Sequence, residues 1–344
     1  MPISPTALTI KDLPPPPPGK LGWPWTEQSQ PLSDHMPDGS EWPRISIVTP
    51  SYNYGQFLEE TIRSVLLQGY PNLEYIIMDG GSKDNSVEII RKYEPWLQYW
   101  VSEPDNGQTA AIQKGFSKST GVVWNWLNSD DILEKNALQK VADAFRDNPQ
   151  ATLFFGELIF FDEQKQFIEK TFFKSFSELV CLWETWSCIQ PAIFMSSSGC
   201  QEANGFDASL NYVMDYYLYT QLALLPGFSV CQLNTPIARF RMHSLSKTGS
   251  KQFPTHHEVL TVFDNLAEKY PSLLPKGWQK SRSRFTYHVA LASVIDSAED
   301  GVSLYSFVKT SVSFLPIIWN YRFFWIVLLK TILGLNPLRV TKSI

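Results

Sequence analysis

Two adjacent carboxylates, Asp130 and Asp131, directly follow a mainly apolar run from Val122 to Leu127. A short run of β-branched and aromatic residues is typical of a buried strand in a parallel sheet. Open α/β sheets bind their ligands at the carboxyl ends of such strands. Because neighbouring aspartates repel each other, a divalent cation with oxygen ligands would stabilise the pair and could hold a diphosphate. The alternative is a Ser-Asp-Asp turn that caps a helix beginning near Leu133.

Two further acids stand at the ends of predicted strands upstream. Asp79 closes the run Leu73–Met78, and Asp105 follows the run Tyr99–Ser102. Four acids at successive strand ends are too regular for solvated turns alone, and carboxylates accept hydrogen bonds from the base and the ribose hydroxyls of a nucleotide. The chain has no glycine-rich loop of either common nucleotide-binding spacing. We therefore expect a metal, and not a backbone cradle, to hold the phosphates.

The segments between these acids alternate between strand and helix. Arg44–Thr49 has a strand pattern, Phe57–Leu66 has apolar residues at helical spacing, and Leu73–Asp79 followed by Val87–Tyr93 repeats the unit. Successive strand–loop–helix units predict parallel neighbours joined by right-handed crossovers. The sequence thus predicts an α/β fold with a mainly parallel, Rossmann-like sheet flanked by helices, which brings the acids to one edge.

Length and composition narrow the class of protein. A chain of 344 residues suffices for one large α/β domain with an accessory region. A net charge of -5 lacks the basic surplus of a nucleic-acid binder, so we expect no nucleic acid partner. The four cysteines show neither metal-ligand nor disulfide spacing and indicate thiols in a reducing compartment. Residues 1–20 do not resemble a secretory signal, so we expect a cytoplasmic location.

The composition along the chain predicts that it is divided into three regions. Residues 1–43 are rich in Pro, Ser, Gly and Asp, with five consecutive prolines, and are predicted to form a tail or linker. Trp23 and Trp25 interrupt this segment and leave open a contact with the domain or with a partner. Residues 44–250 are predicted to form the α/β domain, and residues 251–344 a helical C-terminal region.

Five motifs resemble, in order and spacing, those of family 2 glycosyltransferases. They are Pro50–Asn53, Thr61–Val65 with Gln68, Asp79–Asp84, Glu103–Gly107 and Asn128–Asp131. The resemblance covers about residues 44–245. It implies the GT-A fold, with a mixed, mainly parallel sheet, and transfer from a nucleotide-sugar donor with inversion at the anomeric carbon, aided by Mg²⁺ or Mn²⁺. Two positions depart from the family pattern, which often has Asp in place of Asn128 and Asn in place of Gln113.

The resemblance also implies roles for individual residues. Asp79 would contact the base, Asp105 would lie near the nucleoside, and an Arg-x-His-x-x-Ser loop beginning at Arg241 would close over the diphosphate. The implied donor-binding residues are Pro50, Tyr52, Asp79, Asp105, Asp130 and Arg241. The implied metal ligands are Asp130, Asp131 and His243. From the chemistry alone, neutral imidazole binds divalent metals and a guanidinium can neutralise a leaving diphosphate, although a lone His is usually an ordinary surface or core residue.

Asp215 opens a predicted helix that continues to about Leu225. A sugar hydroxyl is a poor nucleophile until its proton is being removed, so an inverting transfer needs a carboxylate on the acceptor side. Asp215 resembles the family's catalytic base in position. The alternative is a charge favoured by the helix dipole in the first turn. Many relatives carry a second acid two residues later, where this chain has Tyr217. Upstream, Trp183 or Trp186 could shape the acceptor site by stacking on a sugar, and the alternative, which is more common for Trp, is a place in the core.

The segment from Ser313 to Lys330 is rich in aromatic and aliphatic residues. Its longest uncharged run is shorter than the roughly 20 residues that a spanning helix needs. A helix lying at the membrane surface, with Arg322 and Lys330 reaching water, fits better. The alternative is a helix that packs on the catalytic domain. A lipid-linked acceptor would give the membrane location a purpose.

Together these features predict a cytoplasmic, metal-dependent glycosyltransferase. If the C-terminal helix lies at the membrane surface, the protein would be a peripheral membrane protein. It would add one sugar to a polysaccharide or lipid-linked acceptor of the cell envelope, because the Gln-x-x-Arg-Trp sequence of processive relatives is missing. Two other classes stay open. A nucleotidyltransferase would also place acids and a metal here but needs a basic triphosphate loop, which we do not find. A non-catalytic membrane-associated scaffold would explain Asn128, Gln113 and Tyr217 as decay of the site.

Overall fold

The structure is a computed structural model that describes residues 7–161, 166–170, 190–203, 205–207, 209–210, 212–243, 252–274, 276–296, 304–312, 314–318 and 322–333. The chain divides into two compact units. The first consists of Met1–Ser175 and Ser187–Met242, and the second of Phe176–Trp186 and His243–Ile344.

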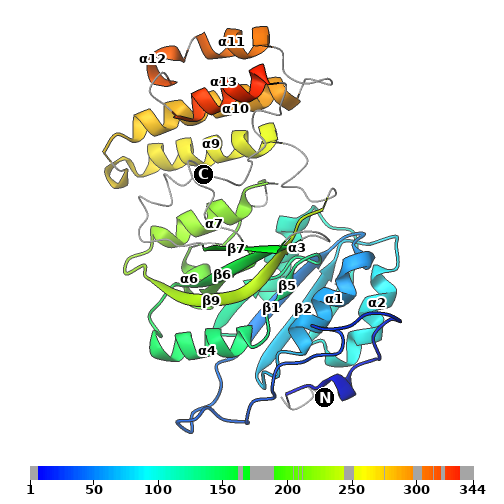
Figure 1. The fold of residues 1–344 in the computed structure, drawn as a ribbon. Coiled ribbons are helices and arrows are strands. Elements are labelled where there is room, and N and C mark those ends of the chain that lie inside the picture. The colour runs from blue at the N-terminus through cyan, green and yellow to red at the C-terminus, as the bar shows by residue number, and fades with distance from the viewer. Residues whose placement is uncertain are drawn as a thin grey trace. The chain divides into compact units, whose positions relative to one another are not determined.

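The first unit is built on one mixed sheet (Figure 1). Its described strands are β1 (Ile45–Ser51), β2 (Leu73–Asp79), β3 (Tyr99–Ser102), β4 (Val123–Trp126), β5 (Ile132–Leu133), β6 (Leu153–Phe161), β7 (Gln166–Lys170), β8 (Ile193–Ser196) and β9 (Val230–Arg241). Their order is β3-β2-β1-β4-β8-β6-β9-β5, with β7 also on β6. Strands β1 to β4 are parallel, and β8 is antiparallel to β4 and β6. The prediction of a mixed sheet is confirmed.

Helices cover both faces of this sheet. They are α1 (Gly55–Leu66), α2 (Ser86–Tyr93), α3 (Gln108–Lys118), α4 (Ala137–Asp147), α6 (Ser197–Glu202) and α7 (Met214–Ala223), with short 3-10 turns η1 (Ile10–Asp12) and η2 (Glu94–Trp96). Apolar residues of α1, α2 and α4 share one core with β1 and β2, and α1 and α2 lie side by side in Figure 1. All seven residues of β1 are buried, as expected for a parallel strand covered on both faces.

Helix α3 packs closely on the other side of β1 and β2. A Cβ added at Gly115 would lie 2.4 Å from Val48 Cγ1, so only glycine permits this approach. Beside it, Trp124 and Trp126 of β4 contact Phe206, and Trp126 stacks on Tyr219 of α7. The continuous apolar run of β4 therefore reflects burial beneath α3 and α7.

The N-terminal segment differs from the linker that its composition predicts. The Arg63 guanidinium, fully buried in α1, donates hydrogen bonds to the carbonyls of Pro14, Pro24 and Trp25 at 2.8, 3.1 and 3.0 Å. The indole N–H of Trp23 donates to the Leu133 carbonyl at 2.9 Å. Residues 7–43 thus lie on the first unit, because carbonyls of a proline-rich chain can satisfy a buried cation without forming a helix or strand.

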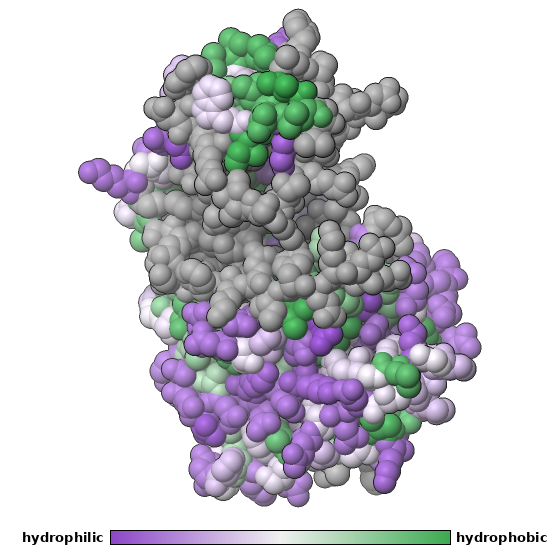
Figure 2. All heavy atoms as spheres, in the orientation of Figure 1, coloured by the Kyte–Doolittle hydropathy of each residue, from purple (hydrophilic) through white to green (hydrophobic). Residues whose placement is uncertain are grey.

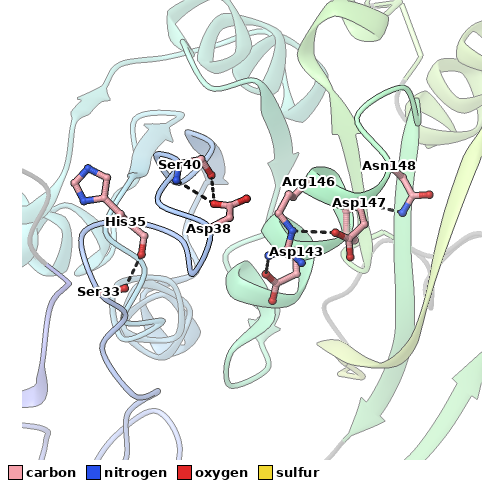
Figure 3. Close-up of polar contacts among 9 residues, drawn as sticks. Ser33, His35, Asp38, Ser40, Asp143, Arg146, Asp147 and Asn148 are labelled. Carbon is pink, nitrogen blue, oxygen red and sulfur yellow. Dashed lines mark hydrogen bonds and ion pairs between the residues drawn. The ribbon is translucent and has the colours of Figure 1, made fainter.

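A polar turn of the same segment lies beside the end of α4 (Figure 3). The Ser40 backbone N–H and hydroxyl both donate to Asp38, which holds the pKa of that carboxyl below its usual value. On α4, Arg146 pairs with Asp143 and Asp147. These groups are largely exposed, so their pairing adds little stability.

The second unit is helical over its described residues. It contains α9 (Gln252–Lys269), η4 (Pro271–Leu273), α10 (Trp278–Asp296), α11 (Leu304–Val312), α12 (Leu315–Ile318) and α13 (Arg322–Ile332). Phe263 of α9 and Phe285 of α10 are buried and contact Trp278 and His256 of the facing helix, and Arg282 donates twice to Asp264 at 2.6 Å. Tyr287 of α10 is buried beside Ser311 of α11, with 2.8 Å between their hydroxyl oxygens. None of the helices in the described part of the chain is both long and apolar enough to cross a membrane. The predicted C-terminal helical region is confirmed.

Candidate active site

The ends of β1, β2 and β3 place three polar residues in a row. The strand registers align Ser51 with Asp79 and Asp79 with Ser102. Asp79 is 2% exposed and accepts four hydrogen bonds, from the backbone N–H groups of Gly81 and Ser82 and from the hydroxyls of Ser82 and Ser102. Three of the four donors reach Oδ2. Each carboxylate oxygen accepts about two hydrogen bonds, so Oδ1, which has one donor, can accept a further bond from a ligand.

The loops after β1 and β2 are joined to each other. Asn53, in a left-handed conformation with a φ of 55°, accepts from the Lys83 backbone N–H at 2.7 Å, and its own N–H donates to the Ser82 hydroxyl. Asp84 accepts from the N–H of Gly55, which begins α1. Pro50 is buried within β1, whereas Tyr52, directly after this strand, is 59% exposed.

Asp105 lies against the loop that follows Asp79. Its carboxylate accepts from the Gly107 N–H at 2.8 Å, just before α3 begins. A Cβ added at Gly80 would lie 2.9 Å from Asp105 Oδ2, so the two loops approach each other closely here. The structure therefore brings Asp79 and Asp105 to the same edge, as the strand pattern predicts, and leaves the Asp105 side chain exposed.

Asp131 is the most deeply buried acid of the Asp130–Asp131 turn, with 1% exposure. Burial and the neighbouring charge of Asp130 raise its pKa well above the usual value. Its carboxylate accepts from the Arg241 backbone N–H at 3.1 Å and from the Asn128 amide at 3.3 Å. Burial, together with the charges of Asp130 and Asp131, raises the pKa of Tyr54 to about 12, so this phenol stays protonated.

Asn128 connects three segments at this turn. Its Nδ2 donates to Asp131 and to Gln190 Oε1, and its Oδ1 accepts from Gln108 Nε2 at 2.8 Å. Gln108 begins α3, and Gln190 also donates to the Trp126 carbonyl at the end of β4. Tyr54, Gln108 and Gln190 are not among the site residues predicted from the sequence. Gln108 directly follows the Glu103–Gly107 motif, which is the signal that could have identified it.

Arg241 is the last residue of β9 and lies beside the Asp130–Asp131 turn. Its Nε donates to the Asp130 carbonyl at 2.9 Å, and its NH2 group pairs with Glu60 at 2.7 Å. The guanidinium also lies 4.8 and 4.5 Å from the ring centroids of Phe57 and Phe161. Arg241 is thus held in place by Glu60 and two aromatic rings.

Asp215 stands in the first turn of α7. It retains some solvent contact, but the surrounding protein raises the pKa of its carboxyl to about 6, although the Tyr216 N–H donates to it at 2.8 Å. The Thr109 hydroxyl in α3 donates to the Leu210 carbonyl at 2.8 Å and contacts Met214. The starts of α3 and α7 therefore meet, which places Asp215 on the side of the unit where Gln108 and Asp105 lie.

Some expected site residues are not placed among these groups. His243 belongs to the second unit, so its role as a metal ligand stays a prediction. Trp183 and Trp186 lie outside the described residues. Gln113, one of the two departures from the family pattern, is exposed on α3.

The Asp130–Asp131 turn fits a divalent metal in part. Two adjacent carboxylates are hard oxygen donors, and a cation would offset the repulsion that raises the pKa of Asp131. Among the described residues, no group of three or more His, Cys, Asp and Glu is placed to hold an ion. Mg²⁺ is commonly bound by one or two carboxylates with substrate phosphates and water completing its shell. The turn suits a metal that binds together with a diphosphate.

Comparison with known sequences gives one consistent family. The family model described as "Glycosyl transferase family 2" matches residues 46–197. An uncharacterised glycosyltransferase of Rickettsia typhi is 30% identical over 249 residues, which cover 68% of this chain and 76% of the relative. TuaG of Bacillus subtilis, named for teichuronic acid biosynthesis, is 32% identical over 117 residues, which cover 33% of this chain and 46% of TuaG.

Solved structures show the same fold at low identity. TarS 1–349 of S. aureus, in complex with UDP-GlcNAc, superposes with a TM-score of 0.55 at 12% identity, covering 85% of this chain and 92% of TarS 1–349. PcManGT from Pyrobaculum calidifontis, a mannosyltransferase in complex with GDP-Man and Mn²⁺, has a TM-score of 0.52 at 14% identity and covers 85% of both chains. At such identities the likeness concerns the fold.

Proposed function

This chain belongs to glycosyltransferase family 2 and has the GT-A fold, and from that premise we propose that it transfers one sugar from a nucleotide-sugar donor to an acceptor hydroxyl with inversion. The observation that carries the proposal is the convergence of Asp79, Asp105 and the Asp130–Asp131 turn at one edge of the sheet. The donor would lie across this edge. Its base and ribose would meet Asp79 and Asp105, with Pro50 and Tyr52 beside them.

Asp215 is the proposed general base. A carboxyl whose pKa is about 6 is ionised at neutral pH yet remains a better proton acceptor than an ordinary aspartate. It would take the proton from the acceptor hydroxyl as the oxygen attacks the anomeric carbon from the face opposite the leaving diphosphate. Inversion follows from that direct displacement. Tyr217 offers no second carboxylate on α7, so the proton has one acceptor there.

We propose that Asp130, Asp131 and His243 hold Mg²⁺ or Mn²⁺ together with the donor. When bound, the cation would stabilise negative charge on the leaving nucleoside diphosphate. Arg241 is positively charged, as the cation is, and it adjoins the Asp130–Asp131 turn. The negative charge of Glu60, which pairs with Arg241, offsets that positive charge. We therefore assign Arg241 to positioning of the turn and to long-range attraction of the diphosphate.

The donor class follows by analogy with the structural neighbours. TarS binds UDP-GlcNAc and PcManGT binds GDP-Man, and both ligands are nucleoside diphosphate sugars. For the acceptor, the name of TuaG supports a polymer of the cell envelope, either a polysaccharide or its lipid-linked precursor. A lipid-linked acceptor would place the protein at the membrane surface.

The test is to measure donor binding and turnover on the same preparations. UDP- and GDP-sugars are screened with Mn²⁺ or Mg²⁺ and with EDTA, and released nucleoside diphosphate is quantified. Asp215→Asn should retain donor affinity but lose roughly 10²-fold or more in turnover, because the amide cannot accept the proton. Asp207→Asn, in the loop that precedes α7, is the matched control and should remain active.

Two results would contradict the proposal. Near-normal turnover of Asp215→Asn would move the base to another carboxylate. Failure of every donor to bind or turn over, with the folded wild-type chain and metal present, would favour the non-catalytic scaffold.

A further inference from the structure

Exposed apolar side chains gather on two neighbouring helices of the second unit. The described members are Val308 and Val312 of α11, Trp325, Leu329 and Ile332 of α13, and Leu333 directly after it, with exposures between 45% and 61%. Helices α11 and α13 pack against each other. Figure 2 shows hydrophobic residues collected in the upper part of the view, where these helices lie in Figure 1. We call these six residues the apolar face.

The spacing on α13 makes this face continuous. Trp325, Leu329 and Ile332 are four and three residues apart, so they share one side of the helix. Phe324, whose ring meets that of Trp325 edge-on with centroids 5.0 Å apart, is only 5% exposed, so α13 also buries apolar surface. The apolar face is therefore a second hydrophobic surface of a helix whose core contact is satisfied. An exposed patch of this kind usually marks a binding surface.

The charge of the C-terminal segment indicates what covers the face. The last 44 residues contain five basic residues and no acidic one, although the whole chain has 34 acidic and 29 basic residues. Lys309 of α11 and Lys330 of α13 are among the basic five. A contact between two copies through this face would bring these basic residues of both copies together. A surface that is both apolar and negatively charged would satisfy both features.

We propose that the apolar face docks on a lipid bilayer containing anionic lipids. The side chains would enter the boundary between headgroups and acyl chains, with Trp325 at the depth that tryptophan prefers, and the lysines would contact the lipid phosphates. Such docking is peripheral and does not require a spanning helix. It depends on this surface alone and not on the transfer reaction.

The test is sedimentation of the full chain with vesicles of phosphatidylcholine, with and without phosphatidylglycerol. The wild type should pellet with the anionic vesicles, and high salt should weaken binding. Leu329→Glu combined with Ile332→Glu should lower partitioning at least tenfold, because it replaces two inserted side chains by charges. Lys309→Gln should lower it about fivefold. Leu21→Glu, at a leucine that is 78% exposed in the N-terminal segment, is the matched control and should bind like the wild type.

Thermal melting of each variant and sedimentation velocity without lipid complete the experiment. A folded, monomeric wild type whose anionic binding is lost only in the variants of the apolar face supports the proposal. Equal binding of the wild type and the double variant would overturn it, as would a wild type that binds neither vesicle. A wild-type dimer that the double variant converts to monomers, with no binding to vesicles, would assign the face to a second copy.

Discussion

Asn128 occupies a position where a carboxylate would change the charge of the candidate active site. Its amide donates to Asp131 and Gln190, and its carbonyl oxygen accepts from Gln108. An aspartate there could not donate to either acceptor and would add a third negative charge beside Asp130 and Asp131. The asparagine thus joins β4, α3 and the turn without increasing the repulsion among the acids.

We expect Asn128→Asp to destabilise the metal-free protein by about 1–3 kcal/mol, because it leaves polar partners without a donor and adds like charge. Mn²⁺ with UDP or GDP should recover much of that loss. Thermal melting with and without these ligands measures both effects. Asn265→Asp, on the exposed side of α9, controls for the added charge alone. Equal melting of wild type and Asn128→Asp in the metal-free state would contradict the role of the amide.

The pH dependence of turnover should report the ionisation of Asp215. Its carboxyl has a pKa of about 6 in the folded protein, and only the ionised form can accept a proton. The rate at saturating donor should therefore fall as the pH drops below about 6 and level off above it. The measurement is turnover between pH 4.5 and 8.5 on protein that circular dichroism shows to be folded. An unchanged rate from pH 7 to 5 would exclude Asp215 as the base.

The contribution of Asp215 to stability should fall as the pH rises, whereas its contribution to turnover should increase. Because its pKa is raised from 3.8 to about 6 on folding, the folded state binds this proton more tightly than the unfolded state does. The stabilisation from the protonated form is fully present below the unfolded pKa and is lost as the pH rises through about 6. Asp215→Asn should thus melt higher than wild type at pH 7.5 and equally at pH 3.5. A lower melting temperature at pH 7.5 would mean that the carboxylate stabilises α7.

At the scale of elements, the N-terminal segment depends on one side chain of α1. The buried Arg63 guanidinium binds three carbonyls of this segment and the Tyr93 hydroxyl, and it lies over the Trp25 ring. We expect Arg63→Met to cost about 3 kcal/mol or more, since it leaves these acceptors buried without a donor. Urea unfolding measures this difference. Arg91→Met on the exposed side of α2 should have little effect, and an equal loss in both variants would contradict the argument.

The elements with a periodic pattern were predicted from the sequence, whereas for the N-terminal segment a contact with the domain was only left open. Alternating strand and helix patterns predicted the sheet edge at which Asp79, Asp105 and the Asp130–Asp131 turn meet. Residues 7–43 have no such pattern, because their order comes from carbonyls and from single contacts such as Trp23 with Leu133. The amide contacts of Gln108 and Gln190 could not be predicted either, since they depend on loops that meet only in the folded chain.

At the scale of the whole molecule, ligands should stabilise the protein jointly. No group of three or more His, Cys, Asp and Glu is placed to hold an ion among the described residues, so Mn²⁺ or a nucleoside diphosphate alone should bind weakly. Together at about 100 times their dissociation constant they should add about 2.7 kcal/mol to the free energy of unfolding. Thermal melting with each ligand alone and with both tests this coupling. Equal shifts from metal alone and from the pair would indicate a preformed metal site.

The division of the chain into residues 1–43, 44–250 and 251–344 stays a prediction as a set of domain boundaries. The two compact units do not each follow one continuous stretch, because the first unit resumes at Ser187 after an interruption. Composition along the chain cannot reveal that residues 176–186 belong to the same unit as the C-terminal residues. Separate expression of 44–250 would also omit residues that cover Arg63.

The N-terminal segment is synthesised before the residues that it contacts. Its contact from Trp23 to Leu133 spans 110 residues of sequence, and its contacts to Arg63 require α1 to be formed. During synthesis at about 5–20 residues per second, the segment must therefore wait several seconds for its partner. A nascent chain that is cleaved or captured there in that interval would yield an otherwise complete protein with an uncovered arginine in its core.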